Sequence, residues 1–247
     1  MELAGKTALI TGGARRVGRA IALSLAAGGA DIALHYSRSA DQAEATAGDI
    51  RRLGRRCERI AADLSQPADI ERMFQQVAAR LGRLDILVNN ASVYDRAPLE
   101  TLSAAQWDAE MAVNARAPAL CIRHAAAMMT SGGAIINITD SAAQLGLPNF
   151  IAYAASKAAL ESITKSAALA LASRAIRVNA VAPGVVAWPE KQPTDDAAEA
   201  YHQRVLEQVP MRREDRPDDI AAAVLFLVRN EYVTGQSLRV DGGWNMD

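Results

Sequence analysis

The sequence predicts an α/β protein built on a doubly wound parallel sheet flanked by helices. Three observations carry this prediction. Short apolar runs alternate with helical stretches along the chain, which is the pattern of βαβ units. The first apolar run ends in a glycine-containing turn that opens a helix. The length of 247 residues, with no linker and no internal repeat, fits a single domain over residues 1–247.

The strands are predicted from short apolar segments bounded by turn residues. A continuous apolar run, rather than an alternating one, indicates a strand buried on both faces, as in a parallel sheet. The predicted strands are Thr7–Thr11, Asp31–Tyr36, 57–62, Leu84–Asn90, Ala134–Ile138, Ile176–Val181 and Ser237–Val240.

The helices are predicted between these strands, where right-handed crossovers place them on both faces of the sheet. The basic residues near Arg51 and Arg52 predict a solvated face on one of them. Residues 185–208 lack a strong apolar period, so we expect a loop with a short helix there. The predicted helices are 16–28, 40–53, 67–81, 103–130, 150–173 and 217–229.

The composition excludes several classes of protein. The 27 basic and 28 acidic residues leave a net charge of −1, which argues against a nucleic-acid binder. Cys57 and Cys121 show no metal-ligand spacing and cannot form a disulfide framework, so we expect reduced thiols and no metal site. Neither a signal peptide nor an apolar run of membrane-spanning length is recognisable, so we expect a cytoplasmic protein with no membrane partner.

A phosphate-binding turn is predicted between the first strand and the first helix. Gly12 permits the tight turn, Gly18 lets the helix pack close to the sheet, and the helix N-terminus offers N–H groups to a pyrophosphate. The strict Gly-x-Gly-x-x-Gly pattern is absent, so an ordinary strand–helix turn is the alternative interpretation.

The residues after the second strand favour NADPH over NADH. NAD-binding folds usually place an acidic residue here for the ribose 2′-hydroxyl, but residues 35–39 contain none. Arg16 and Arg38 can instead neutralise a 2′-phosphate, with Ser37 or Ser39 as hydrogen-bond donors. The alternative is that Arg38 is a solvated loop charge.

Tyr153 and Lys157 form the candidate catalytic pair. Their i, i+4 spacing at the start of a predicted helix puts them on one face, about 5–6 Å apart at Cβ. A nearby ammonium favours the phenolate, so we expect Lys157 to lower the pKa of Tyr153. The alternative is a tyrosine at the edge of the core beside a solvated lysine.

In this order and spacing, the motifs resemble those of the short-chain dehydrogenase/reductase family over the whole chain. The resemblance implies an extended Rossmann fold with a seven-stranded parallel sheet, and a homotetramer. The matching segments are Thr11–Gly18, Asp63, Asn89–Ala91, Asn114, Tyr153 with Lys157, Pro183–Gly184, Thr234–Gln236 and Val240–Gly243.

Three departures from the family pattern are similar to the pteridine reductase branch. Arg16 replaces a glycine, and Ser92 follows Asn89–Ala91 where a glycine is usual. Asp140 stands thirteen positions before Tyr153, where the family has its catalytic serine; Ser141 is offset by one position and is expected to point elsewhere. This likeness implies NADPH-dependent reduction of a dihydropterin, dihydrobiopterin or dihydrofolate to the tetrahydro form.

The resemblance also assigns roles to individual residues. In the catalytic set, Asn114 and Lys157 join Asp140 and Tyr153. The substrate residues are Ser92, Tyr94, Asp140, Tyr153 and Trp188, with the ring of Tyr94 stacked on the pterin. The cofactor residues are Gly12, Arg16, Val17, Gly18, His35, Tyr36, Arg38, Ser39, Asp63, Leu64, Asn89, Ala91, Ser92, Lys157, Pro183 and Gly184.

The chemistry of such a site is coherent. Reduction of a C=N bond places a hydride on carbon and a proton on nitrogen, and NADPH is the hydride source. Tyr153 with Asp140 forms the proton-donating pair, and which of the two gives the proton is left open. The alternatives are an NADPH-dependent carbonyl reductase acting on an oxoacyl thioester or another ketone, and a non-catalytic NADPH sensor.

Overall fold

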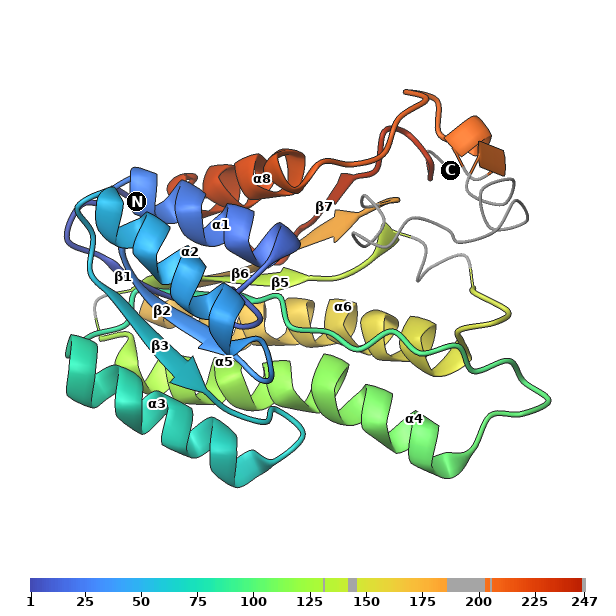
Figure 1. The fold of residues 1–247 in the computed structure, drawn as a ribbon, viewed down its shortest axis with the longest axis horizontal. Coiled ribbons are helices and arrows are strands. Elements are labelled where there is room, and N and C mark those ends of the chain that lie inside the picture. The colour runs from blue at the N-terminus through green and yellow to red at the C-terminus, as the bar shows by residue number, and fades with distance from the viewer. Residues whose placement is uncertain (131, 142–145, 186–202, 205, 246–247) are drawn as a thin grey trace.

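Seven parallel strands lie side by side in the order β3-β2-β1-β4-β5-β6-β7 in the computed structural model, which describes residues 1–130, 132–141, 146–185, 203–204 and 206–245 (Figure 1). Every neighbouring pair is parallel. The strands are β1 (Thr7–Ile10), β2 (Asp31–Tyr36), β3 (Cys57–Ala61), β4 (Ile86–Asn89), β5 (Gly133–Ile138), β6 (Ile176–Pro183) and β7 (Ser237–Val240).

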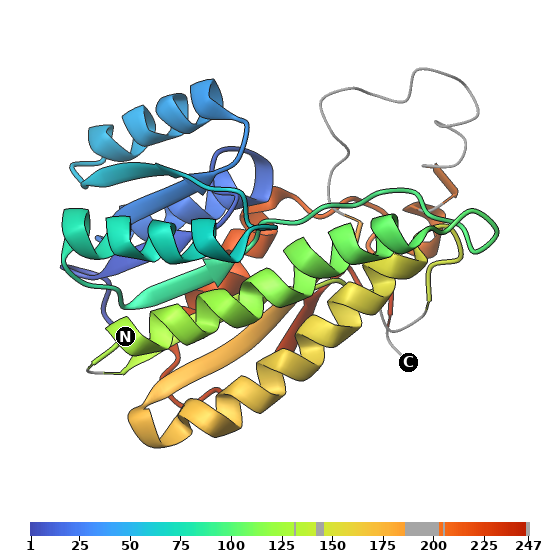
Figure 2. The same ribbon diagram turned by 90° about the horizontal axis from the view of Figure 1, so that it is seen from below.

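Helices cover both faces of this sheet (Figures 1 and 2). One face carries α1 (Arg16–Ala27), α2 (Ala40–Arg52) and α8 (Pro217–Arg229). The other carries α3 (Pro67–Leu81), α4 (Ala104–Met111), α5 (Ala117–Met128) and α6 (Ile151–Leu171). Each layer has its own apolar cluster against the sheet. The central strands are therefore buried on both faces, and every residue of β1 and β5 is buried.

The order of the strands reverses between β1 and β4. The chain winds outward from β1 to β3, returns to β4 beside β1, and then winds outward the other way. Ala8 pairs with Ile86 and Ile10 with Val88 across this junction. In a doubly wound sheet the loops diverge at such a point, and the crevice at the carboxyl ends of the strands is where ligands bind. The fold therefore places its binding crevice at the ends of β1 and β4.

The predicted helix over 103–130 consists of three segments. α4 begins at a capping box, in which Gln106 N donates to Ser103 Oγ (3.2 Å) and Ser103 N donates to Gln106 Oε1 (3.1 Å). A five-residue π-helical turn, Ala112–Arg116, separates α4 from α5 and contains Asn114. Such turns are frequent at functional sites. Hydrophobic periodicity could not reveal this turn, because the helix continues on both sides of it.

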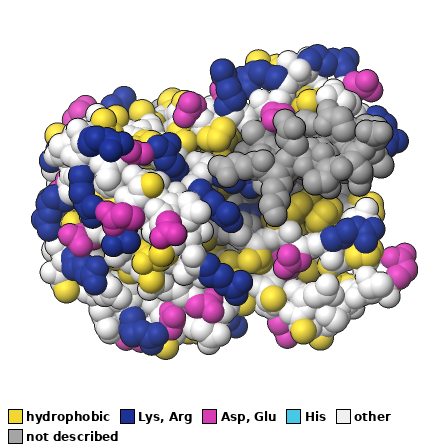
Figure 3. All heavy atoms as spheres, viewed as in Figure 1, with side chains coloured by type: hydrophobic (Ala, Val, Ile, Leu, Met, Phe, Trp, Pro, Cys, Tyr) yellow, Lys and Arg dark blue, Asp and Glu magenta, His cyan; other side chains and the backbone are white. Residues whose placement is uncertain are grey.

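The predicted fold class, a doubly wound seven-stranded parallel sheet flanked by helices, is confirmed. The polar face predicted near Arg51 and Arg52 is also present, because Arg51 pairs with Glu44 (2.9 Å) and Arg52 with Asp49. Figure 3 shows basic and acidic side chains interspersed over this side of the molecule. No helix in the described part of the chain is both long and apolar enough to span a bilayer. Most of the predicted loop at 185–208 lies outside the described residues.

The turn between β1 and α1 gives a stability prediction with a matched control. A Cβ added at Gly18 would lie 2.2 Å from Gly12 O and 2.6 Å from Asn90 Nδ2, whereas one added at Gly48 of α2 would meet nothing within 4 Å. Gly18→Ala should lower the free energy of unfolding by about 1–3 kcal/mol because it overpacks the turn. Gly48→Ala should raise it by about 0.5–1 kcal/mol through helix propensity. Urea unfolding of both variants checks the contrast; equal effects would contradict it.

Candidate active site

Hydrogen bonds tie the ends of β1 and β4 together at the switch point. The side chain of Asn90 donates from Nδ2 to Thr11 O (2.9 Å) and Gly12 O (3.1 Å). In return, Thr11 Oγ1 accepts from Asn90 N (2.9 Å) and Ala91 N (3.1 Å). Gly12 has a φ of +64°, and a Cβ there would lie 3.0 Å from Ala91 Cα. The turn therefore needs glycine at position 12.

The N-terminus of α1 fits a dinucleotide phosphate. Because Gly18 has no side chain, the helix lies against the turn at a distance that any Cβ would prevent. Its first turn contains no acidic residue, and Arg16, with a φ of +50°, is exposed there. Free N–H groups at a helix N-terminus, approached by backbone alone, make a cradle for an anion. Val17 lies half-buried in this first turn.

The side chain of His35 is buried and forms a hydrogen bond with the backbone of the phosphate-binding turn. This corrects the expectation that His35 contacts the 2′-phosphate region of the cofactor. Its ring is 1% exposed, and Nδ1 accepts from Gly12 N at 3.0 Å. Since Nδ1 is an acceptor, Nε2 carries the proton and donates to Ala62 O at 3.2 Å. Burial lowers the pKa of His35 to about 4, so the ring is neutral. A buried neutral imidazole with both nitrogens engaged cannot neutralise a phosphate.

The side chains beyond β2 leave an exposed basic edge. Arg38 is exposed, whereas Tyr36 and Ser39 are half-buried at the end of β2 and the start of α2. Asp63, after β3, accepts at Oδ1 from Ser65 N (2.9 Å). Hydrogen bonds from Ser65 and, to a lesser extent, the charge of Arg38 lower the pKa of Asp63. Arg38 and Asp63 therefore face the same region, where a 2′-phosphate and an adenine were predicted.

Two further predicted cofactor residues direct their side chains into the protein. Asn89 is 3% exposed and donates from Nδ2 to Asn137 Oδ1 (2.8 Å), so it ties β4 to β5. Leu64 packs in the apolar cluster beneath α3 and α5. Their backbone is what can reach a ligand, and their place in the cofactor site remains a prediction. Ala91 stays at the crevice because its backbone borders Gly12.

The catalytic candidates Asp140, Tyr153 and Lys157 meet where β5 ends and α6 begins. Tyr153 OH donates to Asp140 Oδ2 at 2.7 Å. Lys157 Nζ donates to Ile138 O at 2.9 Å and lies 5.6 Å from the centroid of the Tyr153 ring. The i, i+4 spacing on α6 and the position of Asp140 just after β5 bring the three groups together. By contrast, Ser141 Oγ is buried and finds no hydrogen-bond partner among the described residues.

Burial governs the proton chemistry of this pair. The pKa of Tyr153 is raised well above its usual value, first by burial and then by the charge and hydrogen bond of Asp140. Burial lowers the pKa of Lys157 to about 8, although Asp140 and Glu110 raise it. The expectation that Lys157 lowers the pKa of Tyr153 is therefore wrong. The phenol therefore stays protonated at neutral pH, the form that a proton donor needs.

Asn114 holds the loop after β4 rather than facing the crevice. Its side chain is fully buried in the π-helical turn. Oδ1 accepts from Val93 N (2.9 Å) and Ser92 Oγ (3.1 Å), and Nδ2 donates to Val93 O (2.9 Å) and Ser156 Oγ (3.1 Å). Asn114 thus positions the loop that carries Ser92, and its place in the catalytic set remains a prediction.

Tyr94 forms an aromatic platform with a residue that the sequence did not single out. Its ring is 56% exposed and stacks on Phe150, with centroids 4.2 Å apart and planes 10° apart. It also forms a T-shaped pair with the ring of Tyr153, with centroids 4.6 Å apart and planes at 83°. Phe150 directly precedes α6. Its β-bridge to Ala97 connects the segment before α6 to the loop after β4. A flat ring surface therefore lies beside the phenol of Tyr153.

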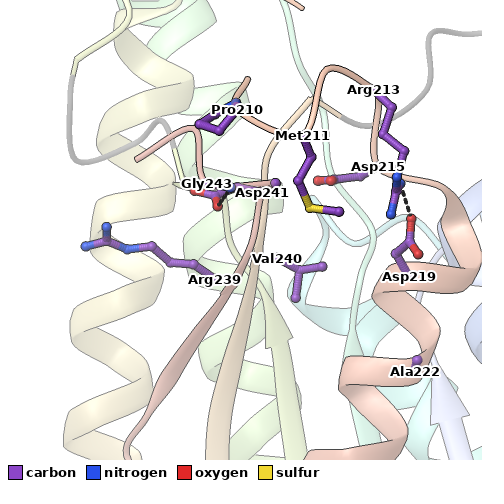
Figure 4. A pocket seen from close by; sticks show the side chains of 11 residues that line it. Pro210, Met211, Arg213, Asp215, Asp219, Ala222, Arg239, Val240, Asp241 and Gly243 are labelled. Atoms are coloured by element: carbon purple, nitrogen blue, oxygen red, sulfur yellow. Dashed lines mark hydrogen bonds and ion pairs between the residues drawn. The ribbon is translucent and has the colours of Figure 1, made fainter. Parts of the chain in front are cut away.

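A pocket of about 620 Å³ lies at the carboxyl end of β7 (Figure 4). Arg213, Asp215 and Asp241 are among its lining residues, and Asp140, Tyr153 and Lys157 are not. Asp215 Oδ2 accepts from Gly184 N (2.7 Å), just after Pro183 ends β6, and burial raises the pKa of Asp215 to about 6. The pocket wall thus reaches the predicted Pro183–Gly184 motif. Trp188, predicted to bind substrate, lies outside the described residues.

Comparisons with known proteins define the family. The family model described as "Enoyl-(Acyl carrier protein) reductase" matches residues 12–245. The 3-oxoacyl-(acyl-carrier-protein) reductase FabG of Staphylococcus epidermidis is 36% identical over 245 residues, covering 98% of this chain and 99% of that protein. The chain belongs to the short-chain dehydrogenase/reductase family.

Two solved structures share the fold and were crystallised with cofactor. A short chain dehydrogenase from Burkholderia cenocepacia in complex with NADP is 37% identical, with a TM-score of 0.92 and coverage of 99% and 100% of the two chains. The angucycline C-6 ketoreductase LanV with bound NADP is 34% identical, with a TM-score of 0.90 and coverage of 100% and 98%. The names of these relatives support the family and do not support the predicted pteridine reductase branch.

The buried imidazole of His35 predicts a loss of stability in acid. Its pKa of about 4 in the folded protein is below its usual 6.5, so between these values the unfolded chain binds a proton that the folded chain does not. Stability therefore falls as the pH drops from 6.5 to 4, by up to about 3 kcal/mol from this group. Urea unfolding should show this loss in the natural chain and a smaller one in His35→Asn. His124→Gln, a control at the half-buried ring stacked on Phe74, should keep the full loss.

Proposed function

We propose that this protein reduces the C=N bond of a flat heterocycle of the dihydropteridine class, including dihydrofolate, with NADPH as the reductant. The observation that carries the proposal is the hydrogen bond from Tyr153 OH to Asp140 Oδ2 at 2.7 Å, where most of the family has a serine. The expected homotetramer and cytoplasmic location remain predictions.

The cofactor is NADP(H), which supplies the hydride when bound. The glycine turn at Gly12 and Gly18 offers backbone to the pyrophosphate, and Arg16 and Arg38 are the cations available to a 2′-phosphate. The crystal structures of relatives with NADP support this assignment. Lys157, buried beside Tyr153, would face the nicotinamide ribose.

The charge of Asp140 distinguishes the two classes of substrate that could accept the hydride, a ketone and a C=N bond. A ketone gathers negative charge on its oxygen as it is reduced, so it needs hydrogen-bond donors there. An ionised Asp140 cannot donate and would oppose that charge. A C=N bond is instead activated by a proton on nitrogen, and a neighbouring carboxylate stabilises the resulting cation. Tyr153, which stays protonated, is the donor in contact with Asp140, and water can refill the pair.

The aromatic platform fits a flat substrate. The exposed ring of Tyr94 lies beside the phenol of Tyr153, with Phe150 stacked behind it. Aromatic faces prefer offset stacking with other planar rings, so a bicyclic heterocycle would lie flat here with its edge toward the proton donor. Ser92, exposed next to this platform and anchored to Asn114, is placed to contact both cofactor and substrate.

The names of the relatives favour a second candidate, an NADPH-dependent carbonyl reductase. FabG is named for an oxoacyl thioester and LanV for a ketone. Such a reaction would use the same Tyr153 and Lys157, with Asp140 protonated so that its hydroxyl donates to the carbonyl oxygen. The two candidates therefore differ in the group at position 140, and an exchange at this position separates them.

The proposed reaction is tested by NADPH oxidation with dihydrobiopterin, dihydrofolate and a panel of ketones. We expect turnover with a pteridine, and we expect Asp140→Ser to lower that turnover by roughly 10²-fold or more, because general acid catalysis is worth at least this much. If only ketones are reduced, the carbonyl reductase is the correct assignment. If pteridines are reduced but Asp140→Ser improves their turnover, the role given to Asp140 is wrong. Ser141→Ala is the matched control and should leave the rate unchanged, since its hydroxyl makes no hydrogen bond within the described residues.

The cofactor assignment predicts a selective loss of affinity. Arg38→Ala and Arg16→Ala should each weaken NADPH binding by about 10- to 100-fold, the effect of losing one charge-assisted hydrogen bond. Binding of NADH, which has no 2′-phosphate, should change little. Arg52→Ala, at the far end of α2 and paired with Asp49, is the control and should change neither. Dissociation constants from nucleotide fluorescence titrations test this; equal losses for the two nucleotides would contradict the role of the arginines.

A further inference from the structure

Glu110 is a buried carboxyl beside the candidate active site that the proposed reaction does not use. It lies in the last turn of α4 and is 1% exposed. Oε1 accepts from Asp95 N at 2.8 Å, and Oε2 accepts from Asn114 Nδ2 at 2.7 Å. Both oxygens are thus acceptors, one toward the loop after β4 and one toward the π-helical turn.

The two donors that face position 110, Asp95 N and Asn114 Nδ2, favour a carboxylate there. Asn114 is held in one orientation by Val93, because Oδ1 accepts from Val93 N and Nδ2 donates to Val93 O, both at 2.9 Å. Its NH₂ group therefore faces Glu110 Oε2 at 2.7 Å and Ser156 Oγ at 3.1 Å. A glutamine in place of Glu110 would have one acceptor oxygen and would set its own NH₂ against a donor. Burying a donor without an acceptor is unfavourable, so an amide cannot satisfy both contacts.

These contacts hold the chain on both sides of Tyr94. Val93 is anchored through both backbone groups by Asn114, and Asp95 is anchored through its N–H by Glu110. Tyr94, between them, extends its side chain onto Phe150 and the edge of Tyr153. The direction of the Tyr94 ring therefore depends on two anchors that come from one helical segment, α4 and its π-helical turn.

We propose that Glu110 is a positioning residue for substrate recognition, which fixes the loop 92–95 so that the Tyr94 ring is presented beside Tyr153. The proposal rests on the proposed function only in taking Tyr94 as the surface on which the substrate lies. Burial raises the pKa of Glu110, whereas the Asp95 N–H, the Asn114 amide and the charge of Lys157 lower it. Because both of its oxygens accept hydrogen bonds from the protein, its role is in geometry.

The direct test is hydrogen–deuterium exchange of the peptide that contains residues 92–96 in the natural chain, Glu110→Gln and Asp108→Asn. Asp108 is an exposed carboxyl on the same helix and serves as the matched control. We expect the Asp95 amide to exchange at least tenfold faster in Glu110→Gln, because the loss of one charged acceptor opens the loop. Asp108→Asn should match the natural chain. Unchanged exchange in Glu110→Gln would overturn the proposal without reference to any substrate.

The kinetic test separates positioning from a general loss of structure. Glu110→Gln should raise KM by about tenfold for whichever substrate the natural chain turns over, with kcat changed less than about threefold and NADPH affinity unchanged, since ground-state contact is what is lost. In a Tyr94→Ala background the same change should add little, because the two residues act through one contact. Full additivity, or an unchanged KM, would contradict the role of Glu110.

Two further comparisons distinguish failure of the proposed function from failure of the proposal on Glu110. If ketones are reduced and pteridines are not, the proposed function fails, and Glu110 is judged on the KM for the ketone. If Glu110→Gln does not fold, Glu110→Asp replaces it, because aspartate keeps two acceptor oxygens with a shorter reach. The proposal is supported if the exchange rate and the KM of Glu110→Asp lie between those of the natural chain and those of Tyr94→Ala. Values equal to those of the natural chain overturn it.

Discussion

The hydrogen bonds between Asn90 and the end of β1 are the constraint on which the rest of this structure depends. They close the junction where the strand order reverses, so that two loops leave the sheet at a fixed separation. One loop carries Gly12 and leads to the N-terminus of α1. The other leads through Ala91 to Tyr94. The predicted phosphate-binding turn and the ring of Tyr94 are thus both positioned by the junction between β1 and β4.

Several polar residues of the family motifs form their hydrogen bonds within the protein. His35 supports Gly12 from below, Asn89 ties β4 to β5, and Asn114 holds the loop at Val93. Each is buried, and a buried polar group must find its partners inside the fold. These residues therefore maintain the backbone that faces the ligand, whereas Arg16, Arg38, Ser92 and Tyr94 are exposed.

The fold and the catalytic pair were predictable from the sequence because both depend on local periodicity. Apolar runs and helical spacing located the strands of the sheet, and the spacing of Tyr153 and Lys157 on one helix placed them together. The contact of Asp140 with Tyr153 followed from a position thirteen residues earlier, at the end of a strand. Glu110 and Phe150 were missed. Glu110 stands four residues before Asn114, a spacing that puts side chains on neighbouring positions of a helix, whereas Phe150 precedes α6 and meets Tyr94 from a distant part of the chain.

The sequence by itself determined the order of the strands and helices, the family, and which residue types stand at the ends of the strands. Tertiary structure alone decided which of those side chains face the crevice and in which protonation state. The reason is that side-chain direction and pKa depend on burial by segments distant in the chain. The Tyr153 phenol shows this most clearly: the lysine one turn away predicts a lowered pKa, but burial and the carboxyl of Asp140 raise it, so the phenol stays protonated.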